Sequence, residues 1–221
     1  MALVPLLVYG ITAFGGSAQT TAELIKADEQ RRLNACLEKQ LEDPQDAYED
    51  GLAWLMEGNR PAARYCTATA LIEIGHFVEG ADRLEALAAA PDGGTVHDRA
   101  IYLAQAGNAW LLAGLPEEAV ITLTDAITIS PNDAAIYLDR ARAHLALQDW
   151  EKGEADLDKS LSLEREVLEA HLLRGEARFQ QGELDEAMAD VDIARRLDPN
   201  NIDALLLRGK IREAKWKAAE Q

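Results

Sequence analysis

Small and aliphatic residues recur in this chain with a period of 34 residues, in segments that begin at Ala100, Ala134, Leu168 and Ile202. The eighth residue of every segment is small, namely Gly107, Ala141, Gly175 and Gly209. The twentieth residue is small in the first three segments, namely Ala119, Gly153 and Ala187. Apolar residues follow at positions 24 and 30, as Leu123, Leu157, Val191 and then Ile129, Leu163, Leu197. Because small side chains let two helices approach closely, each segment predicts a pair of packed helices.

Turn residues separate the two helices that each segment predicts. The turns read Ala113-Gly114-Leu115-Pro116, Leu147-Gln148-Asp149-Trp150 and Gln181-Gly182-Glu183-Leu184. Glycine readily adopts the left-handed conformation that ends a helix, and proline fits the first turn of the next one. The segments close with Ser130-Pro131-Asn132 and Asp198-Pro199-Asn200, which are helix-ending sequences.

This pattern resembles the tetratricopeptide repeat, which implies an all-α fold: an α-solenoid of stacked helix-turn-helix units in a right-handed superhelix. We expect repeats at 100–133, 134–167 and 168–201, followed by a C-terminal capping helix at 202–221. An earlier unit is expected at 60–94, with an extended loop over 95–99 after it. Residues 19–59 are interpreted as N-terminal helices, over about 20–41 and 46–57, or as a divergent repeat.

The N-terminal residues predict export. Residues 2–14 form an uncharged apolar run, shorter than the about 20 residues that span a membrane comfortably. The small residues Gly16, Ser17 and Ala18 follow, where a signal peptidase would cleave. We therefore interpret residues 1–18 as a signal peptide and expect a periplasmic protein without stable membrane insertion, although no Lys or Arg follows Met1. A buried apolar N-terminal helix is the alternative.

The chain contains two cysteines, Cys36 and Cys66, and their spacing of 30 residues excludes a CxxC redox motif or metal site. In an oxidising compartment two cysteines usually pair. The expected disulfide would tie the N-terminal helix to the repeat stack, and two buried thiols are the alternative.

Charge and motifs exclude several classes of function. The formal net charge is −17 and is spread along the chain, so the clustered cations that nucleic-acid binding needs are missing. The four histidines are scattered, and no HExxH, GxSxG or phosphate-binding glycine loop occurs. We therefore expect a protein that is not an enzyme and that needs no metal or cofactor.

Arginine occupies position 7 of three segments, as Arg140, Arg174 and Arg208. Aspartate stands at position 23 as Asp156 and Asp190, while the segment without the arginine has Thr122 there. Because arginine and aspartate occur together, we interpret them as ion pairs between adjacent helices. A ladder that grips an acidic ligand is the alternative.

The resemblance also implies that the first helices of successive units line a concave groove through positions 2, 5, 9, 12 and 13. The candidate partner-binding residues are Asn108, Leu111, Leu138, Arg142, Leu145, Leu172, Glu176, Phe179, Leu206 and Lys210. Such a groove suits an extended segment or a helix with apolar side chains and mixed charges. Chaperone-binding relatives clamp a C-terminal carboxylate with basic groups, but Glu176 between Arg142 and Lys210 departs from that arrangement. Packing of Leu138 and Leu172 on neighbouring helices is the alternative.

These features together predict a periplasmic protein-protein interaction module that binds a protein or peptide and serves cell-envelope assembly or a membrane complex. A scaffold that self-assembles into a homo-oligomer through its end helices is the alternative. In the last helix, Trp216 is expected to fold back onto Leu205 and Gly209, or else to mark a second contact surface.

Overall fold

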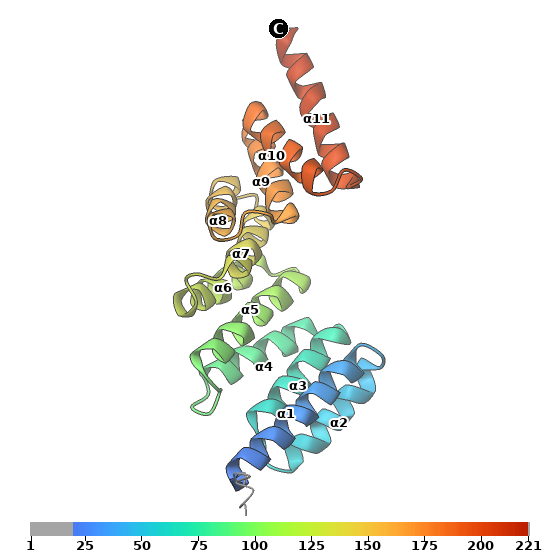
Figure 1. Cartoon of the computed structure of the whole chain (residues 1–221), viewed down its shortest axis with the longest axis vertical. Helices are drawn as coiled ribbons and strands as arrows, with labels where there is room; N and C mark the ends of the chain where they lie inside the picture. Colours follow the sequence, from blue (N-terminus) through green and yellow to red (C-terminus); the bar gives the residue numbers. More distant parts are fainter. Residues whose placement is uncertain (1–19, 221) are drawn as a thin grey trace, which may run out of the picture.

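The computed structural model describes residues 20–220, which form eleven α-helices and no strand (Figure 1). The helices are α1 (Thr21–Gln40), α2 (Pro44–Met56), α3 (Pro61–Glu73), α4 (Phe77–Ala89), α5 (Val96–Leu112), α6 (Pro116–Ile129), α7 (Ala134–Ala146), α8 (Trp150–Leu163), α9 (Leu168–Gln181), α10 (Leu184–Leu197) and α11 (Ile202–Ala219). The expected all-α fold is therefore confirmed. The predicted signal peptide, residues 1–18, lies outside the described residues.

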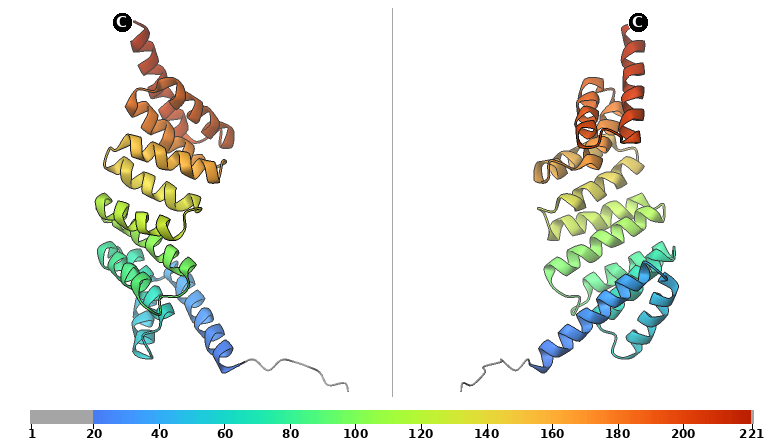
Figure 2. Two further views of the ribbon diagram at one scale, coloured as in Figure 1. Left: turned by 90° about the vertical axis from the view of Figure 1, so that its left-hand side faces the viewer. Right: turned by 45° about the vertical axis from the view of Figure 1, so that its right-hand side comes forward.

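The helices stack into an elongated α-solenoid, from α1 at one end to α11 at the other (Figures 1 and 2). Each helix packs mainly against its neighbours in sequence. The apolar side chains form four buried clusters along the stack; one contains Leu84, Trp110 and Leu123, and another contains Val191 and Ile211. Such a stack is held together level by level rather than by one central core.

Small residues allow the two helices of a pair to nest, as the 34-residue period predicts. A Cβ atom built on Gly107 would lie 2.4 Å from Leu123 Cγ, so a larger side chain would hold α5 and α6 apart. The aliphatic residues at position 24, Leu123, Leu157 and Val191, are completely buried. Those at position 30 lie at the ends of the second helices, where Leu163 and Leu197 remain more than one-third exposed.

The turns inside the four helix pairs from α3 to α10 follow one conformation. Gly75, Gly114 and Gly182 have positive φ angles of 89°, 75° and 83°. In the remaining pair Gln148 takes the same place with φ 60°, although a side chain disfavours this left-handed region. The position in the repeat therefore fixes the backbone conformation even without glycine.

The N-terminal region contains the two helices expected, since α1 and α2 match the predicted ranges closely. The expected extended loop over 95–99 is wrong, because α5 already begins at Val96. Thr95 and Asp98 form a reciprocal capping box, in which the Asp98 backbone N–H donates to Thr95 Oγ1 at 3.2 Å. The additional residues of this unit thus lengthen a helix, because the cap satisfies its first free N–H groups.

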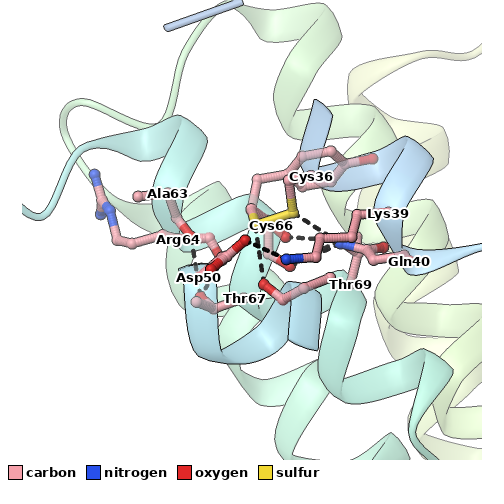
Figure 3. Close-up of a disulfide and its surroundings, with 11 residues drawn as sticks. Cys36, Lys39, Gln40, Asp50, Ala63, Arg64, Cys66, Thr67 and Thr69 are labelled. Carbon is pink, nitrogen blue, oxygen red and sulfur yellow. Dashed lines mark hydrogen bonds and ion pairs between the residues drawn. A yellow bond between two sulfur atoms is a disulfide. The ribbon is translucent and has the colours of Figure 1, made fainter. Parts of the chain in front are cut away.

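A disulfide joins Cys36 of α1 to Cys66 of α3 (Figure 3). Gln40, which is 6% exposed, donates from Nε2 to the Cys66 carbonyl oxygen and to Thr69 Oγ1, both at 3.0 Å. Gly51 of α2 gives the bridge room, because a Cβ atom there would lie 3.0 Å from Cys66 Sγ. The C-terminal part of α1 is thereby fixed to the stack, whereas its first turns are exposed.

Ion pairs link the helices of the later pairs, as expected. Arg140 binds Asp156 through Nε at 2.8 Å and Nη2 at 2.7 Å, and Arg174 binds Asp190 in the same way at 3.0 and 2.6 Å. Asp190 is 1% exposed and also accepts a hydrogen bond from Arg178 Nη1 at 2.7 Å. These arginines hold neighbouring helices together, which confirms the structural interpretation of the ladder.

The last helix corrects one expectation. Trp216 is 61% exposed, and within residues 20–220 no side chain or neighbouring helix would lie within 4 Å of a Cβ atom on Gly209, so the tryptophan does not fold back. All three residues belong to α11, where a rise of about 1.5 Å per residue separates Trp216 from Gly209 by about 10 Å along the axis. The C-terminal half of α11 projects beyond α9 and α10 instead (Figure 1).

Removal of the Cys36–Cys66 bridge should destabilise the N-terminal end of the stack selectively. Closure of the loop between these cysteines contributes about 3 to 4 kcal/mol in the chain-entropy treatment. The Cys36→Ala, Cys66→Ala double variant should therefore show faster amide hydrogen exchange in α1 than the parent protein, with little change in α7 to α10. Reductant should reproduce the effect in the parent protein and change nothing in the double variant, and equal exchange in α1 with and without the bridge would contradict the assignment.

Replacement of Arg174 by Met should lower the free energy of unfolding by about 2 to 3 kcal/mol, because it leaves the buried Asp190 with fewer donors. Arg208→Met is the matched control at the same repeat position, where the side chain is 38% exposed, and should change the value by no more than about 0.5 kcal/mol. Urea unfolding followed by circular dichroism measures both changes. Equal effects of the two substitutions would show that the ladder does not act through the buried pair.

Candidate functional site

The first helices of successive pairs line one side of the solenoid. Contacts link α1 with α3, α5 with α7, α7 with α9 and α9 with α11. Within residues 20–220 the second helices α4, α6, α8 and α10 do not contact each other to a comparable extent. The stack therefore curves toward the first helices, which makes their side the concave one, as the family resemblance implies.

The main hollow on this side is a groove between α9 and α11 with a volume of about 600 Å³. Its lining residues are Leu168, Glu169, Leu172, Leu173, Glu176, Asn201, Asp203, Leu206, Leu207 and Lys210. Four of the ten predicted groove residues meet here, namely Leu172, Glu176, Leu206 and Lys210. We call this hollow the α9–α11 groove.

The α9–α11 groove combines an apolar floor with an acidic rim. Leu206 is 60% exposed, and therefore offers apolar surface that no other described residue covers. Lys210 Nζ lies 4.0 Å from Glu176 Oε2, so this cation is already close to a carboxylate. Glu169, Glu176 and Asp203 outnumber Lys210, which leaves the groove with an excess of negative charge.

Three predicted groove residues point into the protein instead. Leu138 is 8% exposed and packs in the core cluster that contains Leu157. Leu145 lies against Gly153, whose added Cβ would approach Leu145 Cδ2 to 2.6 Å. Phe179 packs against the buried cluster of α10 and α11 that contains Val191. These three side chains help to hold helices together, which is the alternative raised for Leu138, although Leu145 and Phe179 are only partly buried.

The remaining predicted residues lie on α5 and α7. Asn108 Nδ2 donates to Asp139 Oδ2 at 2.8 Å, and Arg142 binds Glu169 through Nε at 2.9 Å and Nη2 at 2.6 Å. Leu111 is partly buried against the largest core cluster. Burial raises the pKa of the Asp139 carboxyl, although Asn108 donates to it. Arg142 therefore meets carboxylates of its own chain, so it is not a free anchor for an acidic ligand.

A smaller hollow of about 360 Å³ lies at the other end of the same face, between α1, α3 and α5. It includes Asn108 together with the exposed leucines Leu41 and Leu112, which are 85% and 61% exposed. The concave side thus offers apolar surface at both ends, and the larger hollow is the one at α9 and α11.

Several residues of the α9–α11 groove were not among the predicted ones. Glu169 and Asp203 both occupy position 2 of their units, which the family resemblance already assigns to the concave face. Leu173 and Leu207 both occupy position 6, which that assignment does not include. The repeat register therefore indicates Glu169 and Asp203 as groove residues. Leu173 and Leu207 are evident only from the packing of α9 on α11.

Within residues 20–220, no group of three or more His, Cys, Asp or Glu side chains is placed to hold a metal ion. No helix in this range is both long and apolar enough to cross a membrane.

Comparison with known proteins gives matches to the tetratricopeptide repeat. The sequence model of the tetratricopeptide repeat matches residues 138–202. The E3 ubiquitin-protein ligase CHIP of Arabidopsis thaliana is 37% identical over 65 residues, which are 29% of this chain and 23% of that protein. The chain therefore spans less than a quarter of this curated relative.

Solved structures cover more of the chain. The second TPR domain of human RPAP3, determined in complex with the HSP70 peptide SGPTIEEVD, is 30% identical, with a TM-score of 0.52 over 53% of this chain and 98% of that domain. A thermophilic TPR protein of Thermus thermophilus is 25% identical, with a TM-score of 0.56 over 85% of this chain and 99% of that one. From the repeat register, the stacked helix pairs and these matches, the chain belongs to the tetratricopeptide repeat family.

Proposed function

We propose that this protein is a non-enzymatic interaction module that binds a segment of a partner protein in the α9–α11 groove. The observation that carries the proposal is the convergence of Leu172, Glu176, Leu206 and Lys210 on one open apolar groove of about 600 Å³. That volume lies within the range of about 300 to 1,000 Å³ that is usual for ligand sites. The human RPAP3 domain, which is bound to a peptide, supports the same use of the repeat.

The charges of the groove favour a ligand that combines apolar and basic side chains. Glu169, Glu176 and Asp203 are partnered by one cation of the groove, Lys210, and by Arg142 from α7. The HSP70 peptide in the RPAP3 complex is acidic, with the sequence SGPTIEEVD. The carboxylates that line the groove would repel such a peptide, so we infer that the ligand of the groove carries basic side chains.

We also propose that the protein is exported and acts in the periplasm, in envelope assembly or a membrane complex. Two features support this proposal. Residues 1–18 have the composition of a signal peptide, and the Cys36–Cys66 disulfide is of a kind that persists in oxidising compartments.

Selection from a displayed library of short random peptides tests the groove. Enriched peptides should carry aliphatic or aromatic residues next to Lys or Arg, because these complement the leucines and carboxylates of the groove. Leu206→Asp should weaken binding of a selected peptide at least about tenfold, as fluorescence polarisation measures.

Leu205→Asp is the matched control, because Leu205 is the adjacent residue of α11, is 46% exposed and lies outside the groove. This variant should bind the selected peptide as the parent protein does. Equal affinity of the Leu206→Asp variant would contradict the proposed site. Selected acidic peptides whose binding Leu206→Asp weakens would contradict the proposed charge of its ligand.

Export has its own test. Expression of the full chain in a Gram-negative bacterium should release a periplasmic protein that begins at Gln19, because a signal peptidase would cut after Ala18. Osmotic shock followed by mass spectrometry of the intact protein determines both the compartment and the N-terminus. Recovery of the chain with residues 1–18 attached, in the cytoplasm, would contradict the proposal.

A further inference from the structure

The last helix, α11, is the first member of a helix pair whose second member does not occur within residues 20–220. In α7 and α9 the residues at position 4 are covered, with Tyr137 9% and His171 5% exposed. The corresponding residue of α11 is Leu205, which is 46% exposed. Leu205, Gly209, Arg212 and Trp216 follow one another at helical spacing along this uncovered side, which we call the pairing face.

Gly209 marks the place where a second helix would nest. A Cβ atom on Gly175 of α9 would lie 3.4 Å from the Ala187 carbonyl oxygen of α10, whereas one on Gly209 would meet no described atom within 4 Å. Glycine inside a helix costs about 1 kcal/mol relative to alanine, and in α11 no contact of the described chain accounts for it. The pairing face therefore resembles the face of α9 that α10 covers, but no described helix covers it.

Within residues 20–220, Arg208 lacks the aspartate partner that the equivalent arginines of the two earlier helix pairs have. Its equivalents Arg140 and Arg174 donate from Nε to the position-23 aspartate of their own pair. In Arg208 the Nε atom is buried yet has no hydrogen-bond acceptor within the described part of the chain. The carboxylate of Asp192, which belongs to the preceding pair, is 4.0 Å away. The donor that binds an aspartate at the two earlier levels is thus left without one at the end of the stack.

We propose that the pairing face of α11 docks an amphipathic helix of a partner protein. This helix presents a small residue, an aspartate three residues later and an aliphatic residue directly after the aspartate. The chain itself provides the template, because α8 offers Gly153, Asp156 and Leu157 to α7, and α10 offers Ala187, Asp190 and Val191 to α9. The aspartate would accept from the guanidinium of Arg208, whose side chain is 38% exposed, and the small residue would lie over Gly209.

A different protein suits this site better than a second copy. The small, aspartate and aliphatic residues of α8 and α10 are buried inside their own stack, so a second copy could offer them only if its helix pairs opened. Two copies would also repel each other, since each carries a net charge of −17. The pairing face adds Arg212 as a further cation, which favours an acidic helix. It is a surface separate from the α9–α11 groove, and the proposal does not depend on occupancy of that groove.

A peptide of residues 183–198, which contains α10 with its capping residues, is the probe for the site. Titration into the 15N-labelled full-length protein should shift the backbone amide signals of Leu205, Gly209 and Arg212. The Asp190→Asn peptide should bind about tenfold more weakly, because it loses a charge-assisted hydrogen bond to Arg208. With the Arg208→Met protein the two peptides should bind alike, since the coupling between the two charges is then absent.

Gly209→Leu is the variant that fills the space over Gly209, where the partner helix would pack. Its side chain would occupy open space in the free protein and leucine favours the helix, so the fold should be retained and the melting temperature should not fall. Binding of the parent peptide should weaken at least about tenfold, while Leu206→Asp in the groove should leave it unchanged.

Three results would overturn the proposal. The Gly209→Leu protein could bind the peptide as tightly as the parent protein, or the shifted amides could lie outside α11. Analytical ultracentrifugation could instead show a dimer of the parent protein that Gly209→Leu abolishes, in which case a second copy, and not a partner helix, occupies the pairing face.

Discussion

Close nesting of two helices at small residues is the constraint on which the rest of this structure depends. Where Gly107 of α5 meets α6, the helices approach until the completely buried Leu123 fills the remaining space. A larger side chain at this glycine would separate the pair. The position of the first helices on the concave side, and therefore the α9–α11 groove, follows from the repetition of this contact.

Electrostatic pairing adds specificity to that packing in the later part of the stack. Arg140 and Arg174 each bind an aspartate of their own pair with two hydrogen bonds, which fixes how far one helix can slide along the other. The earlier pair of α5 and α6 has Thr122 at the position of the aspartate, and its threonine hydroxyl donates instead to Glu85 of α4. The two ends of the solenoid are completed differently, because a disulfide fixes α1 whereas α11 has an open face.

The repeat register predicted the fold well because it is a property of spacing alone. Small residues 34 apart, and arginine paired with aspartate at positions 7 and 23, identify which helices meet whatever the details of the side chains. The groove was predicted only in part, because the helices that cover a leucine, and not its repeat position alone, decide whether it faces solvent. Leu138 and Leu206 share position 5, yet the first is buried by a following helix pair and the second is exposed at the end of the stack. The register also could not show that the additional residues before Ala100 extend α5.

We propose that a partner segment occupies the concave side between α9 and α11. Methyl NMR spectra of the leucine-labelled protein, recorded with and without a bound ligand peptide, test it most directly. The methyl signals of Leu168, Leu172 and Leu206 should shift, while those of Leu123 and Leu157, buried in the stack, should stay in place. Shifts confined to leucines on the second helices, such as Leu163 and Leu197, would place the partner on the convex side and contradict the account.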